Sequence, residues 1–154
     1  LLADACGSSG MTGGQSMDMA AEGRLLDAAG LEHIYRLKTG YLLRASVLSA
    51  AYCRPELPIA TLHALERFVD ALGLAFQVRD DILDIEGTTA ETGKTGGSDQ
   101  ASDKATYPRL FGMAEARARA DELLQQAMAA IADAGPSYDG LRWAARYIVL
   151  RQRA

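Results

Sequence analysis

A run of apolar residues at helical spacing, between residues 62 and 76, constrains the fold of this chain more than any other feature. Apolar side chains recur there every three or four positions, as in an amphipathic helix with one buried face. Because a proline-containing break at 54–58 precedes the run, the sequence predicts a long helix from about residue 59 to residue 85. No stretch of useful length alternates with a period of two, so the predicted fold class is all-α. The apolar positions are Leu62, Leu65, Phe68, Val69, Leu72, Ala75 and Phe76.

Three aspartates, Asp80, Asp81 and Asp84, follow at the end of this predicted helix. Residues three and four positions apart share a helix face, so Asp80, Asp81 and Asp84 lie together, with Gln77 one turn earlier. Like charges at this spacing repel one another, and a bound Mg²⁺, which prefers oxygen ligands, is the simplest reason to collect them. One alternative is an ordinary solvated acidic helix end. A second alternative, a calcium loop, is excluded because Ile82 stands where an EF-hand requires an oxygen ligand.

The segment after the aspartates combines flexibility with positive charge. It is rich in glycine and threonine, has few apolar anchors, and contains Lys94 and Lys104. Loops of this composition can close over a ligand. Two lysines beside a metal-binding helix would suit a diphosphate group.

The carboxyl-terminal third predicts three more helices. Thr106 and Pro108 mark the start of a short helical turn that ends near Gly112. An alanine-rich helix is expected over 115–134, and Ser137 can cap a last helix after it.

Composition excludes several classes of protein. The formal net charge is −4, and no basic patch of the kind that binds nucleic acid is present. No apolar run reaches the length of a membrane span, and no secretory signal is found. The two cysteines, Cys6 and Cys53, have no metal-binding spacing, and we expect them to be buried in a reducing compartment. These features predict a cytoplasmic protein.

The ordered set of motifs resembles the second aspartate-rich motif and the following loop of the trans-prenyltransferases, or polyprenyl synthetases. The similarity is greatest to the bacterial farnesyl diphosphate synthase type within that family. The motifs are Phe76-Gln77-x-x-Asp80-Asp81-x-x-Asp84, Gly93-Lys94, Asp99 and Lys104-x-Thr106-Tyr107-Pro108.

The resemblance implies an antiparallel helical bundle of the isoprenoid synthase type around a central cavity. It implies that an allylic diphosphate, dimethylallyl or geranyl diphosphate, is condensed with isopentenyl diphosphate in a Mg²⁺-dependent reaction, with farnesyl diphosphate as the expected product. A geranylgeranyl or longer-chain polyprenyl diphosphate synthase is an alternative, and so is a noncatalytic subunit of the same fold.

The resemblance also assigns roles to individual residues. Asp80 and Asp84 are expected to bind the metal directly and Asp81 through water. Thr39 would face the developing carbocation, and Gln77 would contact a substrate or stabilise the cation. Phe76 would pack against isopentenyl diphosphate. The residues expected to contact diphosphate are Lys38, Lys94, Lys104, Arg151 and Arg153.

A glycine-rich segment, residues 7–19, lacks the Gly-Lys-Ser/Thr ending of a phosphate-binding P-loop. It is similar to a segment that lies on a central helix in the same family, so we place it on a helix despite its low helix propensity. Gln15 and Asp18 in this segment could face the cavity or pack between helices. The next helix is expected to begin at Asp27 or near Gly30.

The family has two aspartate-rich motifs, and this sequence contains one. The other would lie before Leu1, so we expect residues 1–154 to form the carboxyl-terminal part, about half, of a single domain. These residues alone are expected to be inactive. The resemblance also implies a homodimer.

Overall fold

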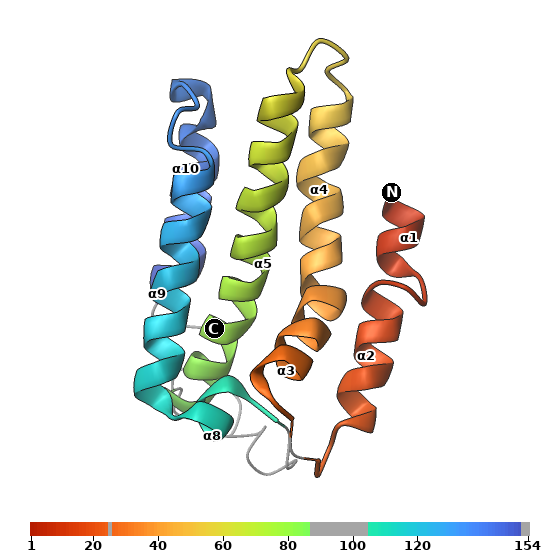
Figure 1. Ribbon diagram of the computed structural model, residues 1–154, viewed down its shortest axis with the longest axis vertical. Helices are drawn as coiled ribbons and strands as arrows, with labels where there is room; N and C mark the ends of the chain where they lie inside the picture. The colour runs from red at the N-terminus through yellow and green to blue at the C-terminus, as the bar shows by residue number, and fades with distance from the viewer. Residues whose placement is uncertain (25, 87–104, 152–154) are drawn as a thin grey trace.

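The computed structural model describes residues 1–24, 26–86 and 105–151. Every regular element in this part of the chain is helical, which confirms the all-α prediction (Figure 1). In chain order the elements are α1 (Leu2–Cys6), α2 (Met11–Ala20), α3 (Ala28–Tyr35), the π-helical turn η1 (Arg36–Gly40), α4 (Tyr41–Tyr52), α5 (Ile59–Glu86), α8 (Tyr107–Phe111), α9 (Met113–Ala130), the 3₁₀ turn η2 (Pro136–Tyr138) and α10 (Asp139–Leu150).

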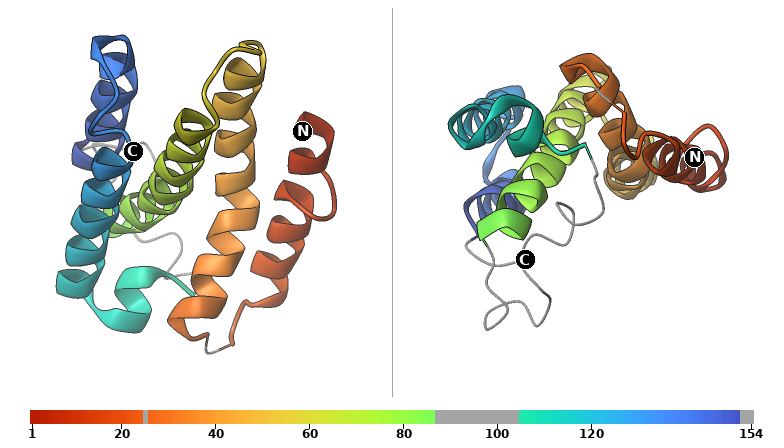
Figure 2. Two further views of the ribbon diagram at one scale, coloured as in Figure 1. Left: turned by 45° about the horizontal axis from the view of Figure 1, so that its top comes forward. Right: turned by 90° about the horizontal axis from the view of Figure 1, so that it is seen from below.

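Helix α5 runs through the middle of the fold, with α4 on one side and α9 and α10 on the other (Figures 1 and 2). Helices α4 and α5 are antiparallel and meet through residues 53–58, and α9 and α10 are antiparallel and meet through residues 131–138. The pair α1 and α2 lies beyond α4, at the edge of the bundle. The expected antiparallel bundle is therefore present.

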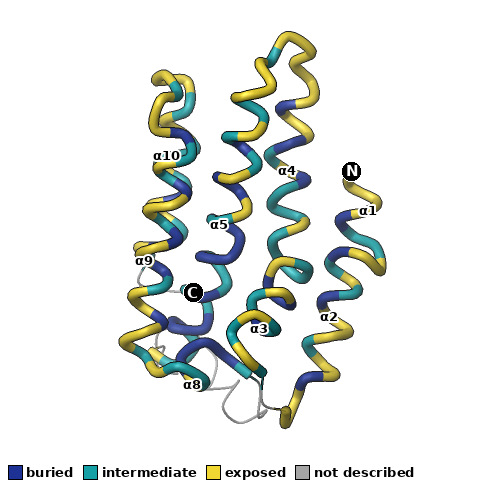
Figure 3. The backbone as a smooth tube through the Cα atoms, viewed as in Figure 1, coloured by how far each residue is buried: buried dark blue, intermediate teal, exposed yellow. Residues whose placement is uncertain are grey.

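The core follows the apolar face of α5. Phe68, Val78 and Ile82 are completely buried, and the carboxyl-terminal half of the helix is more enclosed than its beginning (Figure 3). Ala116 and Ala127 of α9 are also completely buried, and such small side chains let α9 approach α5 closely. The hydrophobic run therefore forms the interior of the bundle and fixes the direction of the acidic end of α5.

Several expected helix boundaries are confirmed. Helix α5 begins and ends within one residue of the predicted limits. Helix α3 begins after Asp27, whose Oδ1 accepts a hydrogen bond from the Gly30 amide at 2.8 Å. Helix α8 begins after Thr106 and ends before Gly112, whose φ of 87° favours glycine.

Two expectations about the carboxyl-terminal third need correction. Helix α9 ends at Ala130, four residues before the predicted end at residue 134. Ser137 lies inside the 3₁₀ turn η2, and Tyr138, without a side-chain hydrogen bond, occupies the position before α10. Pro136 favours a tight turn before the new helix, and this turn displaces Ser137 from the capping position.

The cysteines are less buried than expected. Cys53 is exposed just after α4, and Cys6 is half-buried at the end of α1. No helix in the described part of the chain combines the length and the hydropathy that a membrane crossing requires.

Candidate functional site

The candidate site begins where η1 packs against α5. A π-helical turn accommodates one extra residue in a helix and is often found at functional sites. Here it carries Lys38 and Thr39. A Cβ atom on Gly73 of α5 would lie only 2.9 Å from the Cα atom of Gly40, so the two backbones approach too closely for any other residue at position 73.

Helix α2 also packs against η1. A Cβ atom on Gly14 would lie 2.4 Å from the backbone nitrogen of Lys38, which explains the glycine at this position. The Lys38 ammonium forms an ion pair with Asp18 of α2, with 2.7 Å between Nζ and Oδ2. Asp18 is therefore part of the candidate site through its contact with Lys38, whereas the side chain of Gln15 is exposed.

Thr39 and Gln77 meet across the junction between η1 and α5. The Thr39 hydroxyl donates a hydrogen bond to Oε1 of Gln77 at 2.9 Å, and both residues are half-buried. Two predicted site residues, 38 positions apart in the sequence, are thus in direct contact. The bond fixes the rotamer of Gln77 and leaves lone pairs of the Thr39 oxygen available to a positive charge.

The three aspartates have different surroundings. Asp80 and Asp84 are half-buried and lie one helical turn apart. Asp81 is 4% exposed and points into the bundle, where its Oδ2 accepts hydrogen bonds from the Tyr35 hydroxyl and, at 2.9 Å, from the Tyr107 amide. The side chain of Asp81 therefore connects three helices, α3, α5 and α8.

Burial shifts the pKa values of both side chains in this contact, Asp81 and Tyr35. Desolvation raises the pKa of Asp81 to about 7, although hydrogen bonds from Tyr35, Tyr107 and Gln77 act in the opposite direction. Burial and the charge of Asp81 also raise the pKa of Tyr35 above its ordinary value. The Tyr35 hydroxyl therefore stays protonated and acts as a donor.

Arg151 brings the end of the described chain to the acidic face. Its Nη2 lies 3.0 Å from Oδ1 of Asp80, and its guanidinium carbon lies 4.5 Å from the centroid of the Phe76 ring. The carbonyl oxygen of Arg151 accepts hydrogen bonds from Nε and Nη2 of Arg79. The structure thus brings together Phe76, Asp80 and Arg151, three of the predicted site residues.

Sequence reasoning missed two residues of this region, Tyr35 and Arg79. Tyr35 contacts Asp81, which is 46 residues away in the sequence, and Arg79 contacts Arg151, which is 72 residues away. Neither belongs to the motif that identified the site, and a single sequence contains no signal of such long-range contacts.

Three predicted diphosphate contacts, Lys94, Lys104 and Arg153, lie outside the described residues. Within residues 1–24, 26–86 and 105–151, no three His, Cys, Asp or Glu side chains are arranged to hold a metal ion. The donors that the site does present, the carboxylates of Asp80 and Asp84, are the hard oxygen ligands that suit Mg²⁺. Mg²⁺ commonly takes one or two protein carboxylates and completes its coordination shell with water and substrate phosphates.

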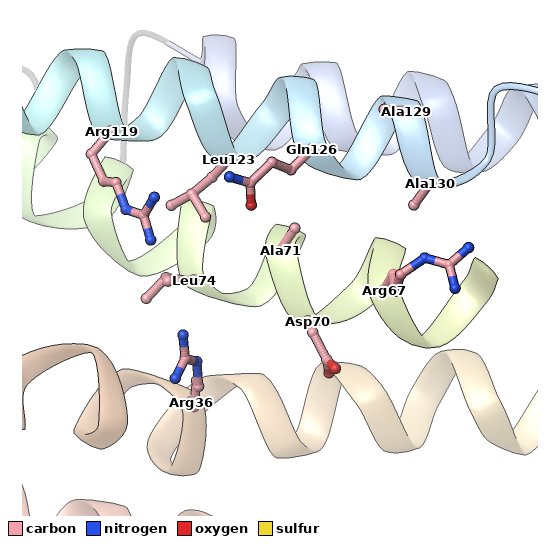
Figure 4. Close-up of a pocket in the computed structure, with 10 residues that line it drawn as sticks. All are labelled: Arg36, Arg67, Asp70, Ala71, Leu74, Arg119, Leu123, Gln126, Ala129 and Ala130. Atoms are coloured by element: carbon pink, nitrogen blue, oxygen red, sulfur yellow. The ribbon is translucent and has the colours of Figure 1, made fainter. Parts of the chain in front are cut away.

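A groove of about 600 Å³ lies between α5 and α9 (Figure 4). Among its lining residues, Asp70 is paired with Arg44, and Arg119 is paired with Glu32 and Glu122. The groove contains none of the residues predicted to bind substrate or metal. It is therefore separate from the candidate site. Its lining residues are Arg36, Arg67, Asp70, Ala71, Leu74, Arg119, Leu123, Gln126, Ala129 and Ala130.

Comparison with known proteins identifies relatives of this chain. Residues 2–137 match the family model of polyprenyl synthetase. The farnesyl diphosphate synthase of Escherichia coli strain K12 is 41% identical over 155 aligned positions, which cover 99% of this chain and 52% of the relative. This chain spans about half the length of the curated relatives that it matches.

Solved structures of related proteins have the same fold as this chain. An FPP/GFPP synthase from Zymomonas mobilis is 33% identical and superimposes with a TM-score of 0.79, over 96% of this chain and 48% of that one. A geranyltransferase from Helicobacter pylori, solved with magnesium and isoprenyl diphosphate, is 27% identical with a TM-score of 0.76, over 92% of this chain and 46% of that one.

Proposed function

We propose that this chain, which belongs to the polyprenyl synthetase family, provides one side of the active site of a chain-elongating prenyltransferase. The observation that carries the proposal is the contact between Thr39 and Gln77 at 2.9 Å. It joins η1, which bears Lys38, to α5, which bears Asp80 one turn after Gln77. The residues that we propose to stabilise the cation, to bind the diphosphate and to bind the metal therefore lie on two elements that contact each other.

The reaction that such a site supports is head-to-tail condensation of two prenyl diphosphates. The carbon–oxygen bond of the allylic diphosphate breaks, and the diphosphate leaves with the electron pair. The double bond of isopentenyl diphosphate attacks the allylic carbocation, and a proton is then lost to give the longer allylic diphosphate. We propose dimethylallyl or geranyl diphosphate and isopentenyl diphosphate as substrates, and farnesyl diphosphate, for which the relative from E. coli is named, as the product.

Thr39 and Gln77 act in the ionisation step as preorganised dipoles. The Thr39 hydroxyl donates a hydrogen bond to Oε1 of Gln77, so its oxygen lone pairs are oriented to face the developing positive charge. Dipoles already oriented towards a developing charge lower a barrier without further reorganisation.

Lys38 serves the other product of the ionisation, the leaving diphosphate. Its ammonium is held by Asp18 at 2.7 Å, which fixes its position before substrate arrives.

We propose that Asp80 and Asp84 bind Mg²⁺, with Asp81 contributing through water as the family resemblance implies. When bound, Mg²⁺ supplies Lewis-acid neutralisation of the charge that develops on the leaving diphosphate. The geranyltransferase from H. pylori, which was solved with magnesium, supports the use of a divalent metal ion.

Several further properties belong to the same proposal. Residues 1–154 form a single domain, around a central cavity, with a further segment that carries the first aspartate-rich motif, and they are inactive without it. The complete protein is expected to be a homodimer in the cytoplasm. Size-exclusion chromatography with light scattering, together with cell fractionation, tests assembly and location.

Diphosphate binding tests the proposal and separates an enzyme from a noncatalytic subunit. In the complete protein, calorimetric titration with inorganic pyrophosphate should show saturable binding in Mg²⁺ and none in EDTA. Lys38→Met and Asp84→Asn should each weaken this binding about tenfold or more, because the first removes a cation that contacts the diphosphate and the second removes a ligand of Mg²⁺. His63→Gln, at an exposed position of α5, is the control. Binding that is absent in Mg²⁺, or unchanged by both substitutions, would overturn the proposal.

A further inference from the structure

The link between Arg79 and Arg151 has a role that the proposed reaction does not account for. Arg79 directly precedes Asp80 on α5, and its Nε donates a hydrogen bond to the Arg151 carbonyl at 3.0 Å, with Nη2 bonded to the same oxygen. Carbonyl groups at the carboxyl end of a helix lack partners inside the helix, so Arg79 satisfies one at the end of α10. This double contact fixes the backbone of Arg151 next to α5.

With its backbone fixed, the Arg151 side chain reaches the acidic face. The guanidinium pairs with Asp80 at 3.0 Å and lies over the Phe76 ring. The Arg151 side chain is 17% exposed, against 48% for Asp80. The buried Nε of Arg151 has no hydrogen-bond partner within the described chain. A buried donor without a partner is unfavourable. The position of Arg151 is therefore imposed by its other contacts.

We propose that Arg79 is a positioning residue that places Arg151 on Asp80 as an internal counter-ion, in competition with a divalent cation for that carboxylate. This inference rests on the proposed function, in which Asp80 is a metal ligand. A guanidinium and a divalent cation repel each other and compete for the same oxygen, so the cation binds Asp80 only when Arg151 moves away.

The competition couples metal binding to substrate binding. A diphosphate that arrives with the cation offers the displaced guanidinium a partner whose geometry it matches. Binding of a cation alone is therefore weakened by Arg151, whereas binding of a cation with a diphosphate is not. This arrangement favours loading of the site in the presence of substrate.

The test is a calorimetric titration of the complete protein with MgCl₂ alone. Arg151→Gln should raise the affinity for Mg²⁺ about two- to fivefold, the size expected when a half-exposed ion pair no longer competes. Arg79→Gln should raise it in the same direction, and the double variant should not exceed the larger single effect, because both residues act through one contact. Arg146→Gln is the matched control, since it removes the same charge from an exposed position of α10.

The outcomes separate this inference from the proposed function. If the unsubstituted protein binds Mg²⁺ and Arg151→Gln leaves the affinity unchanged or lowers it, the inference is overturned and the metal site stands. If additive effects are found for Arg79→Gln and Arg151→Gln, Arg79 does not act through Arg151. If neither the unsubstituted protein nor any variant shows saturable binding of Mg²⁺ alone, the inference is overturned, and the titration with pyrophosphate in Mg²⁺ decides whether the proposed function stands. Far-UV circular dichroism checks that each variant is folded. If Arg79→Gln unfolds the protein, the effect of Arg151→Gln on the affinity for Mg²⁺ still tests whether Arg151 competes with the cation.

Discussion

The hydroxyl of Tyr35 donates a hydrogen bond to Asp81 in the interior of the bundle, across 46 residues of sequence. The same carboxylate oxygen accepts the amide of Tyr107, so one buried side chain connects α3, α5 and α8. Asp81 is the middle acid of the motif, and its carboxylate faces the core while Asp80 contacts Arg151. The acidic motif therefore combines a structural connection with a binding surface.

Removing the Tyr35 hydroxyl should destabilise the protein without changing its fold. Tyr35→Phe leaves a buried carboxylate with one donor fewer, and we expect a loss of about 1–3 kcal/mol in the free energy of unfolding. Urea denaturation measures this loss. Tyr41→Phe removes a hydroxyl from an exposed position and should change the free energy by less than about 0.5 kcal/mol. Equal effects of the two substitutions would show that the contact with Asp81 does not stabilise the fold.

The contribution of Asp81 to stability should depend on pH with a defined sign. Its pKa in the folded state, about 7, is above the ordinary value of 3.8, so the folded protein holds this proton more tightly than the unfolded chain. The stabilisation is complete below about pH 4 and is lost as the pH rises through about 7. The difference between the two pKa values corresponds to roughly 4 kcal/mol.

Urea denaturation at pH 5 and pH 8 tests this dependence, with Asp81→Asn as the reference that cannot titrate at position 81. The unsubstituted protein should lose more stability between these pH values than Asp81→Asn does. If the unsubstituted protein loses no more stability than Asp81→Asn, the pKa of Asp81 is not raised in the folded state.

The close approach of η1 and α5 should be sensitive to a single methyl group. Gly73→Ala places a Cβ atom 2.9 Å from the Cα atom of Gly40, where only backbone movement can make room. We expect a loss of about 1–3 kcal/mol, as for other overpacked interiors. Gly140→Ala in α10 is the control, because nothing lies within 4 Å of its new Cβ atom and alanine favours a helix. Thermal unfolding should show a lower midpoint for the first and an unchanged or higher midpoint for the second.

Thr39 should affect the chemical step more than substrate binding. Thr39→Val keeps the size of the side chain but removes the oxygen that is held by Gln77. We expect kcat of the complete protein to fall about ten- to a hundredfold, with less than about a threefold change in KM for either substrate. Thr61→Val, near the start of α5, is the control. A rise in KM with unchanged kcat would assign Thr39 to ground-state binding instead.

The sequence was sufficient to predict the central helix, because the information is local. Apolar residues three and four positions apart define the buried face of α5, and a proline-containing break defines its beginning. The short helix α8 was predictable for the same reason, since Thr106 and Gly112 have strong preferences at helix ends. The expected roles of Thr39 and Gln77 came from family resemblance and not from periodicity, and their direct contact is a finding of the structure.

Other features depend on the tertiary structure. The π-helical turn at Lys38 arises where α2, η1 and α5 press together at Gly14, Gly40 and Gly73, and no local pattern signals it. The roles of Tyr35 and Arg79 depend on partners brought near by folding. Cys53 was expected to be buried because cysteine is commonly buried, but its position after the end of α4 leaves it in solvent.

Product analysis after incubation of the complete protein with geranyl diphosphate, isopentenyl diphosphate and Mg²⁺ tests the proposed function most directly. We expect a fifteen-carbon diphosphate, absent in EDTA and reduced at least about a hundredfold by Asp80→Asn. If the folded, complete protein forms no longer prenyl diphosphate, or if Asp80→Asn forms it at the same rate, the proposed function is contradicted.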